Sequence, residues 1–144
     1  MFMGEYHHTI DDKSRLVLPS KFRTMLGDKF IVARGFEKCL YVYSIAEWEK
    51  LENKLKTLPF TKSTARTFMR TFFSGATECE FDRQGRTSLT SPLVSYAGLT
   101  KDCVVIGAND RIEIWDLEEW NKLMEENRDK LSEIAENLFM EDCL

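Results

Sequence analysis

The chain has 144 residues, of which 43% are hydrophobic and 31% are charged, and its formal net charge is −4. This composition is typical of a soluble globular protein; it contains no apolar run long enough to span a bilayer and no signal-peptide pattern at Met1. We therefore expect a cytosolic protein with no membrane partner. Its four cysteines lie at least 24 residues apart and form no Cys-x-x-Cys pair, so we expect reduced thiols, no metal site and no cofactor.

The net negative charge conceals an uneven distribution along the chain. Residues 1–81 carry 13 Lys and Arg against 10 Asp and Glu, whereas residues 82–144 carry 7 against 14. A local field, rather than the average charge, attracts polyanions. The mildly basic first part therefore keeps nucleic acid open as a partner.

The chain contains an internal repeat with a period of 71 residues. Each repeated unit has only about 45 residues, which is below the size at which a lone core is comfortably stable, so we expect the two halves to share one core. The matched positions include Gly4 and Gly75, Ile10 and Phe81, Asp11 and Asp82, and Arg15 and Arg86.

Each unit begins with a β-rich segment, residues 5–10 or 76–81, that ends at a charged turn. This pattern predicts that each unit opens with a hairpin. In the second turn, Gly85 can take the positive φ that a tight hairpin requires. The first turn has Ser14 at that position, which predicts either a modest strain or a different turn type.

After each turn, a short strand leads to a proline, a short helix and a glycine at the helix C-terminus. Two β-rich runs then predict a second hairpin in each unit. The expected helices cover residues 19–26 and 92–97, and the expected strand pairs are 30–33 with 40–43 and 104–106 with 112–115.

Both units finish with a helix start that resembles a capping box, Ser44 with Glu47 and Asp116 with Glu119. In the first unit, apolar residues at helical spacing predict two helices that end at Pro59 and Gly75 and link the units. A similar pattern after Asp116 predicts a matching C-terminal helical pair with an acidic outer face.

No catalytic arrangement is evident in the sequence. The two histidines, His7 and His8, are adjacent on a predicted strand and would point to opposite faces, and no phosphate-binding glycine loop is present. We therefore predict that the protein is not an enzyme and binds no small-molecule substrate.

The basic residues of the two turns are the candidate DNA-binding residues: Lys13, Arg15, Arg83 and Arg86. An arginine side chain donates two parallel hydrogen bonds to phosphate or guanine, and a hairpin tip is narrow enough for the major groove. The alternative is that the turn aspartates pair with Arg15 and Arg86 simply to pin the hairpins. The two interpretations can coexist if the aspartate orients an arginine whose other donors stay free.

Lys62, Arg66 and Arg70 recur every four residues and form a basic stripe, which we interpret as a solvated helix face. The opposite face contains an apolar cluster, which indicates a core or a subunit interface rather than a ligand pocket. The cluster consists of Phe68, Met69, Phe72 and Phe73.

The two turns resemble those of a known family. Residues 82–86 match the Asp-Arg-x-Gly-Arg signature of the bacterial MraZ family, whose members contain two SpoVT-AbrB domains, and residues 11–15 with Pro19 match its first-domain version. Residues 97–101 and 114–120 are also similar. The resemblance implies an α+β fold in which AbrB-like swapped-hairpin units form one pseudo-twofold small β-barrel with flanking helical pairs. The implied units are residues 1–48 and 75–120, with linking helices at 49–74 and a C-terminal helical segment at 121–144.

The resemblance further implies a nucleoid-associated transcriptional regulator, usually a repressor. Such a protein binds promoter repeats upstream of its own division and cell-wall operon and assembles into a homo-oligomeric ring. The resemblance assigns DNA contact to Lys13, Arg15, Arg83 and Arg86. The alternative from another class is a structural or partner-binding ring, in which the turn arginines serve subunit contacts.

Overall fold

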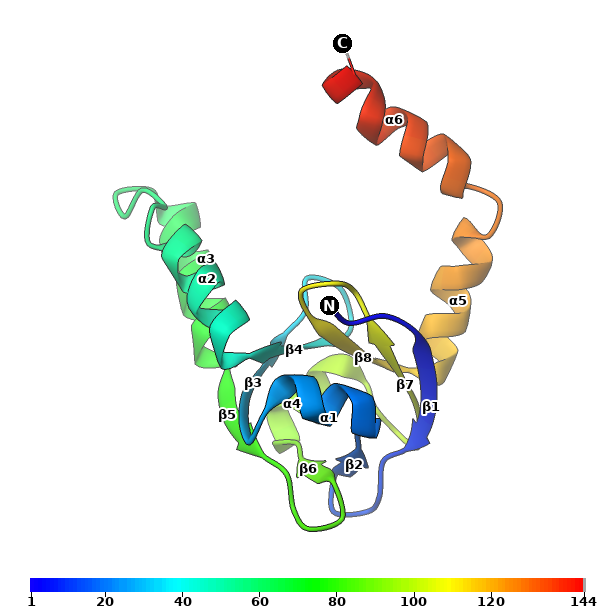
Figure 1. Ribbon diagram of the computed structural model, residues 1–144. Helices are drawn as coiled ribbons and strands as arrows, with labels where there is room; N and C mark the ends of the chain where they lie inside the picture. Colours follow the sequence, from blue (N-terminus) through cyan, green and yellow to red (C-terminus); the bar gives the residue numbers. More distant parts are fainter. Residues whose placement is uncertain (144) are drawn as a thin grey trace.

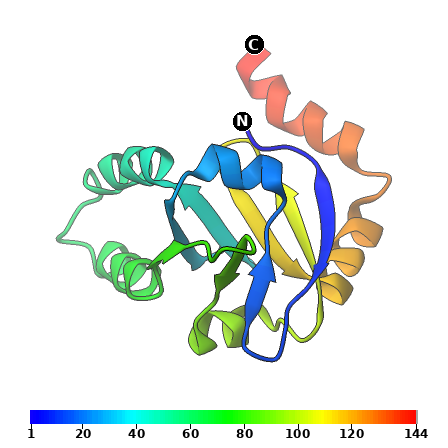
Figure 2. The same cartoon turned by 60° about the horizontal axis from the view of Figure 1, so that its bottom comes forward.

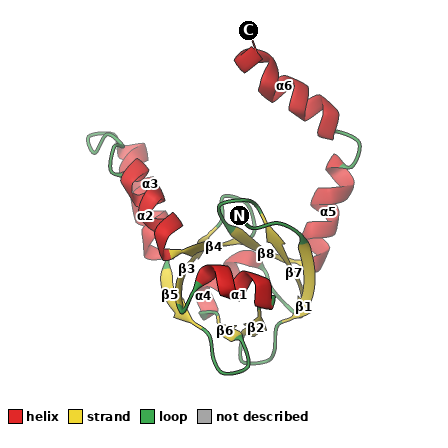
Figure 3. Cartoon of the chain, viewed as in Figure 1, coloured by secondary structure: helices red, strands yellow, loops and turns green. Residues whose placement is uncertain are grey.

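Eight strands and six helices lie in residues 1–143, which the computed structural model describes, with side chains described to residue 140 (Figures 1 and 3). The first half contains β1 (Glu5–Thr9), β2 (Arg15–Val17), α1 (Ser20–Leu26), β3 (Lys29–Arg34), β4 (Leu40–Ser44), α2 (Ile45–Leu55) and α3 (Ser63–Ser74). The second half contains β5 (Thr77–Glu80), β6 (Arg86–Ser88), α4 (Ser91–Ala97), β7 (Asp102–Gly107), β8 (Ile112–Asp116), α5 (Leu117–Asn127) and α6 (Leu131–Cys143). None of the described helices is both long and apolar enough to cross a membrane.

The strands form a six-stranded antiparallel sheet, in the order β1-β7-β8-β4-β3-β5, and a separate two-stranded ladder of β2 and β6. The order is unchanged when every strand is replaced by its counterpart from the other half, so the halves are related by a pseudo-twofold arrangement. The local hairpins β3–β4 and β7–β8 confirm the predicted second hairpin of each unit. The α+β class is confirmed as well.

The prediction that each unit opens with a local hairpin is wrong. Beyond the turn, β1 pairs with β7 of the other half, β5 pairs with β3, and β2 pairs with β6. Each half is too small to bury its own apolar side chains, so exchanging strands lets both halves contribute to one core. The unit boundaries at residues 48, 74 and 120 stay predictions.

Alternating side chains of the six-stranded sheet contribute to two separate buried clusters. On β4, Leu40 and Val42 face the first cluster, whereas Tyr41 and Tyr43 face the second. The first cluster lies between the sheet, the β2–β6 ladder and helices α1 and α4, which overlap in the view of Figure 1 but lie apart in Figure 2. Phe22 from α1 is fully buried there. This cluster joins both halves and forms the predicted shared core.

Helices α2, α3 and α5 cover the other face of the sheet. Trp48 of α2 stacks on Phe72 of α3 with 5.6 Å between ring centroids, and Trp120 of α5 lies 5.8 Å from Trp115 of β8. Phe72 is buried, and its neighbours Phe68 and Phe73 are partly buried against the same cluster. The core interpretation is therefore confirmed for the three phenylalanines, whereas Met69 of the same predicted cluster lines a pocket between α2 and α3.

The two predicted capping boxes behave differently. Ser44 Oγ accepts a hydrogen bond from the Glu47 N–H (3.2 Å) and caps α2 as predicted. Asp116 does not cap α5 with its side chain, because its Oδ1 accepts a hydrogen bond from the Thr100 hydroxyl (3.2 Å) instead. Thr100 lies in the connection between α4 and β7, which is two residues longer than the connection between α1 and β3, so this competing donor exists only in the second half.

The predicted C-terminal helical pair is present, but it is wrong as a copy of the α2–α3 pair. Helix α6 extends away from α5 rather than folding beside it (Figure 1). Its described side chains join neither buried cluster, and Leu131, Leu138 and Phe139 are 77%, 66% and 62% exposed. Hydrophobic spacing predicts a helix here but not what that helix packs against.

A buried polar network in the second half has no equivalent in the first. The Glu113 carboxylate accepts hydrogen bonds from Trp115 Nε1 (2.9 Å) and Arg111 Nε (3.0 Å), and the Arg111 guanidinium lies over the Tyr41 ring at 4.6 Å. The strand pairing aligns Arg111 and Glu113 with Cys39 and Tyr41 of the first half, which are buried in the second cluster and form no such network.

Glu113→Ala is expected to lower the free energy of unfolding by about 2–3 kcal/mol, because it leaves the indole N–H and the Arg111 guanidinium without their acceptor. Urea denaturation measures the change. Glu78→Ala, which removes an exposed carboxylate from β5, is the control and is expected to stay within about 0.5 kcal/mol of the unsubstituted chain. An equally small loss for Glu113→Ala would contradict a stabilising role of the network.

Candidate nucleic-acid interface

The two charged turns project from the same end of the protein. In Figure 1 the β1–β2 and β5–β6 connections form the lower end, opposite the side toward which α2, α3, α5 and α6 extend, and Figure 2 brings this end forward. Strand exchange explains the juxtaposition, because β2 and β6, which follow the two turns, pair with each other. Basic residues 71 positions apart in the sequence thereby come to one surface.

In the first turn, the Asp11 carboxylate organises the loop. Its Oδ1 accepts hydrogen bonds from the backbone N–H groups of Lys13 (3.0 Å) and Arg15 (2.8 Å), and its Oδ2 accepts one from Arg15 Nε (2.7 Å). One side chain therefore fixes both the backbone of the turn and the direction of the arginine.

The second turn repeats this geometry closely. Asp82 Oδ1 accepts hydrogen bonds from the N–H groups of Gln84 and Arg86, both at 2.9 Å, and Oδ2 accepts one from Arg86 Nε at 2.7 Å. The interpretation that the aspartates pin the turns is confirmed. It is compatible with ligand contact, because each aspartate engages Nε and the terminal guanidinium nitrogens carry further donors.

Hydrogen bonds between the halves join the two turns into one unit. The Leu89 N–H donates to the Ser14 carbonyl (2.9 Å), and the Leu18 N–H donates to the Gly85 carbonyl (3.4 Å). Arg86 Nη1 also lies 3.9 Å from Asp11 Oδ2, across the boundary between the halves. The two tips are therefore held at a fixed separation.

Ser14 and Gly85 have the same backbone conformation, with φ values of 59° and 76°. Both turns are closed by the same hydrogen bond to the aspartate carbonyl, from the Ser14 N–H and the Gly85 N–H, each at 3.0 Å. Of the two alternatives for the first turn, strain at Ser14 is confirmed and a different turn type is wrong.

Arg23 of α1 supports the second turn, a role that the sequence analysis missed. A Cβ at Gly85 would lie 2.7 Å from Arg23 Cζ, so the guanidinium sits directly against this glycine. Arg23 Nη1 also donates a hydrogen bond to the Leu18 carbonyl. Its repeat counterpart is Val94, and this asymmetry was the only signal in the sequence.

The four predicted DNA-binding residues fall into two classes. Lys13 and Arg83 are exposed at the tips, whereas Arg15 and Arg86 are half-buried, with 29% and 26% side-chain exposure, and are held by the aspartates. The first pair is placed to reach an anion, and the second pair presents fixed guanidinium edges.

The histidines and the described cysteines offer no rival site. His7 is exposed beside Glu5 (2.7 Å) whereas His8 is half-buried, and burial, followed by the charge of Arg23, lowers the His8 pKa. Burial raises the pKa of the Cys39 thiol to about 12 and that of Cys103 to about 11, which makes both unreactive. Among the described residues, no three His, Cys, Asp or Glu side chains converge as metal ligands.

These observations define a class: a duplicated α+β protein whose halves exchange strands and display two interlocked, cationic turns at one end. A family model described as "MraZ protein, putative antitoxin-like" matches residues 1–71 and again residues 72–142. The two matched segments begin 71 residues apart, which is the period of the internal repeat. The chain therefore belongs to the MraZ family, a family of regulatory type.

Ser14→Gly is expected to raise the free energy of unfolding by about 0.5–1 kcal/mol. It removes the left-handed strain of a residue with a Cβ, and the greater chain entropy of glycine offsets part of the gain. Urea denaturation measures the change. Ser88→Gly in β6, where φ is not positive, is the control and should lower stability. Equal destabilisation by both changes would show that Ser14 is not strained.

Stability is expected to fall on acidification through the two turn carboxylates. Hydrogen bonds from the Arg15 backbone N–H, and then from its side chain, lower the pKa of Asp11 below its ordinary 3.8, and Arg86 does the same for Asp82. On acidification, the unfolded chain therefore takes up these protons at a higher pH than the folded protein does. The stability that the two carboxylates contribute is present above pH 3.8 and is lost as the pH falls through their lower folded-state pKa values.

The measurement is the urea midpoint at a series of pH values from about 5 down to 2. Asp11→Asn/Asp82→Asn should show a smaller fall than the unsubstituted chain. Asp12→Asn is the matched control, because Asp12 lies in the same turn and accepts no hydrogen bond within the described side chains. Equal acid sensitivity of all three proteins would contradict this role.

Proposed function

We propose that the protein is a sequence-specific DNA-binding transcriptional regulator that uses the two turns as its DNA contact. In this proposal it binds promoter repeats upstream of its own division and cell-wall gene cluster as a ring of subunits and represses that cluster. The strand-exchanged halves would correspond to the small AbrB-like barrel that the family resemblance implies. The supporting observation is the pair of interlocked turns, which brings four cations to one end of each subunit and holds two of them against aspartates.

The residues have distinct roles in this proposal. Lys13 and Arg83 contact phosphates, because they are exposed and free of ion pairs within the described side chains. Arg15 and Arg86 present their remaining guanidinium donors to phosphate or to guanine edges. Because aspartates already hold these arginines in place, little side-chain entropy is lost on binding.

The charge distribution favours this end as the DNA contact. Helix α5 contains Glu118, Glu119, Glu125 and Glu126, and it extends away from the turns (Figure 1). Its charge repels phosphate and favours approach by the turn end. The aspartates beside the cations keep the field of one subunit weak, so several subunits must act together, as a ring bound to repeated DNA boxes would allow.

The experiment measures binding to the DNA upstream of the protein's own gene, by fluorescence anisotropy between about 50 and 200 mM salt. Each lost phosphate contact lowers the slope of log K against log[salt] by about 0.9 for every engaged subunit. Lys13→Ala and Arg83→Ala should each have this effect without loss of stability. Arg15→Ala should lower the slope and also destabilise the turn that Asp11 organises.

Lys54→Ala and Arg128→Ala are the matched controls, because both side chains are exposed and lie away from the turns, Lys54 in α2 and Arg128 directly after α5. Their salt slopes should equal that of the unsubstituted chain. Unchanged slopes for both turn variants, in samples that still assemble, would overturn the assignment of these residues. Loss of assembly in Arg15→Ala and Arg86→Ala would instead support the alternative, in which the arginines serve subunit contacts.

A further inference from the structure

Helices α3 and α6 occupy equivalent positions in the repeat but carry opposite charges. The 71-residue period aligns Phe68 and Met69 of α3 with Phe139 and Met140 of α6. Residues 62–74 contain three basic residues and no acidic one, whereas residues 131–143 contain four acidic residues and no basic one. Two copies of one helix have therefore become electrostatically complementary.

Helix α6 also has an apolar face that none of the side chains described for residues 1–140 covers. Leu131, Ile134 and Leu138 follow the i, i+3, i+7 spacing of one helix face, and their exposures are 77%, 41% and 66%. Phe139 extends the same face, and helical spacing places Glu136 at its border. A contiguous apolar face of this kind marks an interaction surface.

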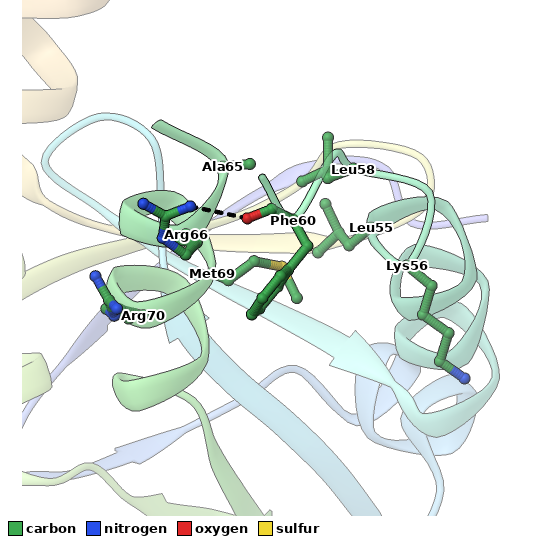
Figure 4. A pocket seen from close by; sticks show the side chains of 8 residues that line it. All are labelled: Leu55, Lys56, Leu58, Phe60, Ala65, Arg66, Met69 and Arg70. Carbon is green, nitrogen blue, oxygen red and sulfur yellow. Dashed lines mark hydrogen bonds between the residues drawn. The ribbon is translucent and has the colours of Figure 1, made fainter. Parts of the chain in front are cut away.

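A matching groove lies where α2 ends and α3 begins. It has a volume of about 270 Å³, and in Figure 4 the side chains of Leu55, Phe60 and Met69 point toward one another around it. The Phe60 side chain is 81% exposed, so its apolar surface is available to an incoming group. Arg66 Nη1 donates a hydrogen bond to the Phe60 carbonyl (2.9 Å) and fixes the loop that forms one wall.

Basic side chains border this groove. Arg66 and Arg70 line it, and Lys62 lies one helical turn before Arg66. None of the three forms an ion pair with the side chains described for residues 1–140. The groove therefore suits an apolar helix with acidic flanks.

The helix and the groove lie on different sides of the same molecule. In Figures 1 and 2, α5 and α6 extend beyond the β1 edge of the sheet, whereas α2 and α3 project beyond the opposite, β5 edge. A contact between unlike surfaces on opposite sides is heterologous, so every added subunit leaves one helix and one groove available until the assembly closes.

We propose that α6 of one copy docks in the α2–α3 groove of a second copy. The Leu131, Ile134 and Leu138 face covers the apolar side chains of the groove, and the acidic residues of α6 approach Arg66 and Arg70. This inference rests on the assembly part of the proposed function, and it names the two surfaces that meet.

The first test introduces a charge on either face of α6 in the full chain. Leu138→Glu is expected to weaken self-association at least tenfold, measured by sedimentation velocity over a concentration series. Asn137→Glu is the matched control, because it places the same side chain at the adjacent exposed residue, away from the apolar face. Equal association of both variants would overturn the proposal.

The second test reverses charges on the two surfaces. Lys62→Glu/Arg70→Glu and Glu133→Lys/Glu136→Lys should each weaken association of the separate proteins. Their equimolar mixture should recover assembly, because each helix then meets a groove of opposite charge on the other variant. Failure of the mixture to recover, or no effect of the α3 reversal, would exclude this pairing and point to contacts between α6 helices.

DNA binding measured on the same variants separates this inference from the proposed function. If dissociated Leu138→Glu binds a promoter fragment at low salt more weakly than the assembled chain does, both proposals are supported. If the assembled, unsubstituted chain ignores that fragment, the DNA role fails while the docking contact stands. Full-affinity DNA binding by the dissociated variant would contradict the role of assembly.

Discussion

The hydrogen bonds from Leu18 and Leu89 to the carbonyl of the opposite turn are the constraint on which the rest of the structure depends. The residues whose carbonyls accept them, Ser14 and Gly85, both have positive φ, and the two bonds flank the pairing of β2 with β6. Once the turns are joined in this way, β1 and β5 are directed toward the other half. The shared core, the paired tips and the separation of the turns from the helices then follow from one local arrangement.

Rigidity at the turns has an electrostatic origin as well as a backbone one. Each aspartate satisfies two N–H groups and one guanidinium nitrogen, so the acidic residues that weaken the positive field also immobilise the arginines. The turns therefore attract phosphate less strongly, but their arginine side chains are already ordered. A tip with basic residues alone would attract phosphate more strongly, but it would lose more side-chain entropy on contact.

Local chemistry predicted much of this fold, and long-range packing determined the rest. The alternation of β4, the cap at Ser44 and the glycine-bearing turn are encoded within a few residues, so the sequence specified them. Strand exchange, the diversion of Asp116 by Thr100 and the support of Gly85 by Arg23 all join residues at least 16 positions apart. The hydrophobic periodicity of a segment does not predict such long-range contacts. Differences between equivalent residues of the two repeats did indicate where the halves diverge.

Because both halves belong to one polypeptide, their sequences can differ from each other. In a dimer of identical chains, every substitution appears twice and the two ends must stay alike. Here Ser14 and Gly85, Arg23 and Val94, and the helices α3 and α6 have each changed independently, so the molecule has a direction, with a cationic helix at one extremity and an anionic helix at the other. The duplicated fold is therefore asymmetric from end to end, although the strand order of its central sheet keeps its twofold symmetry.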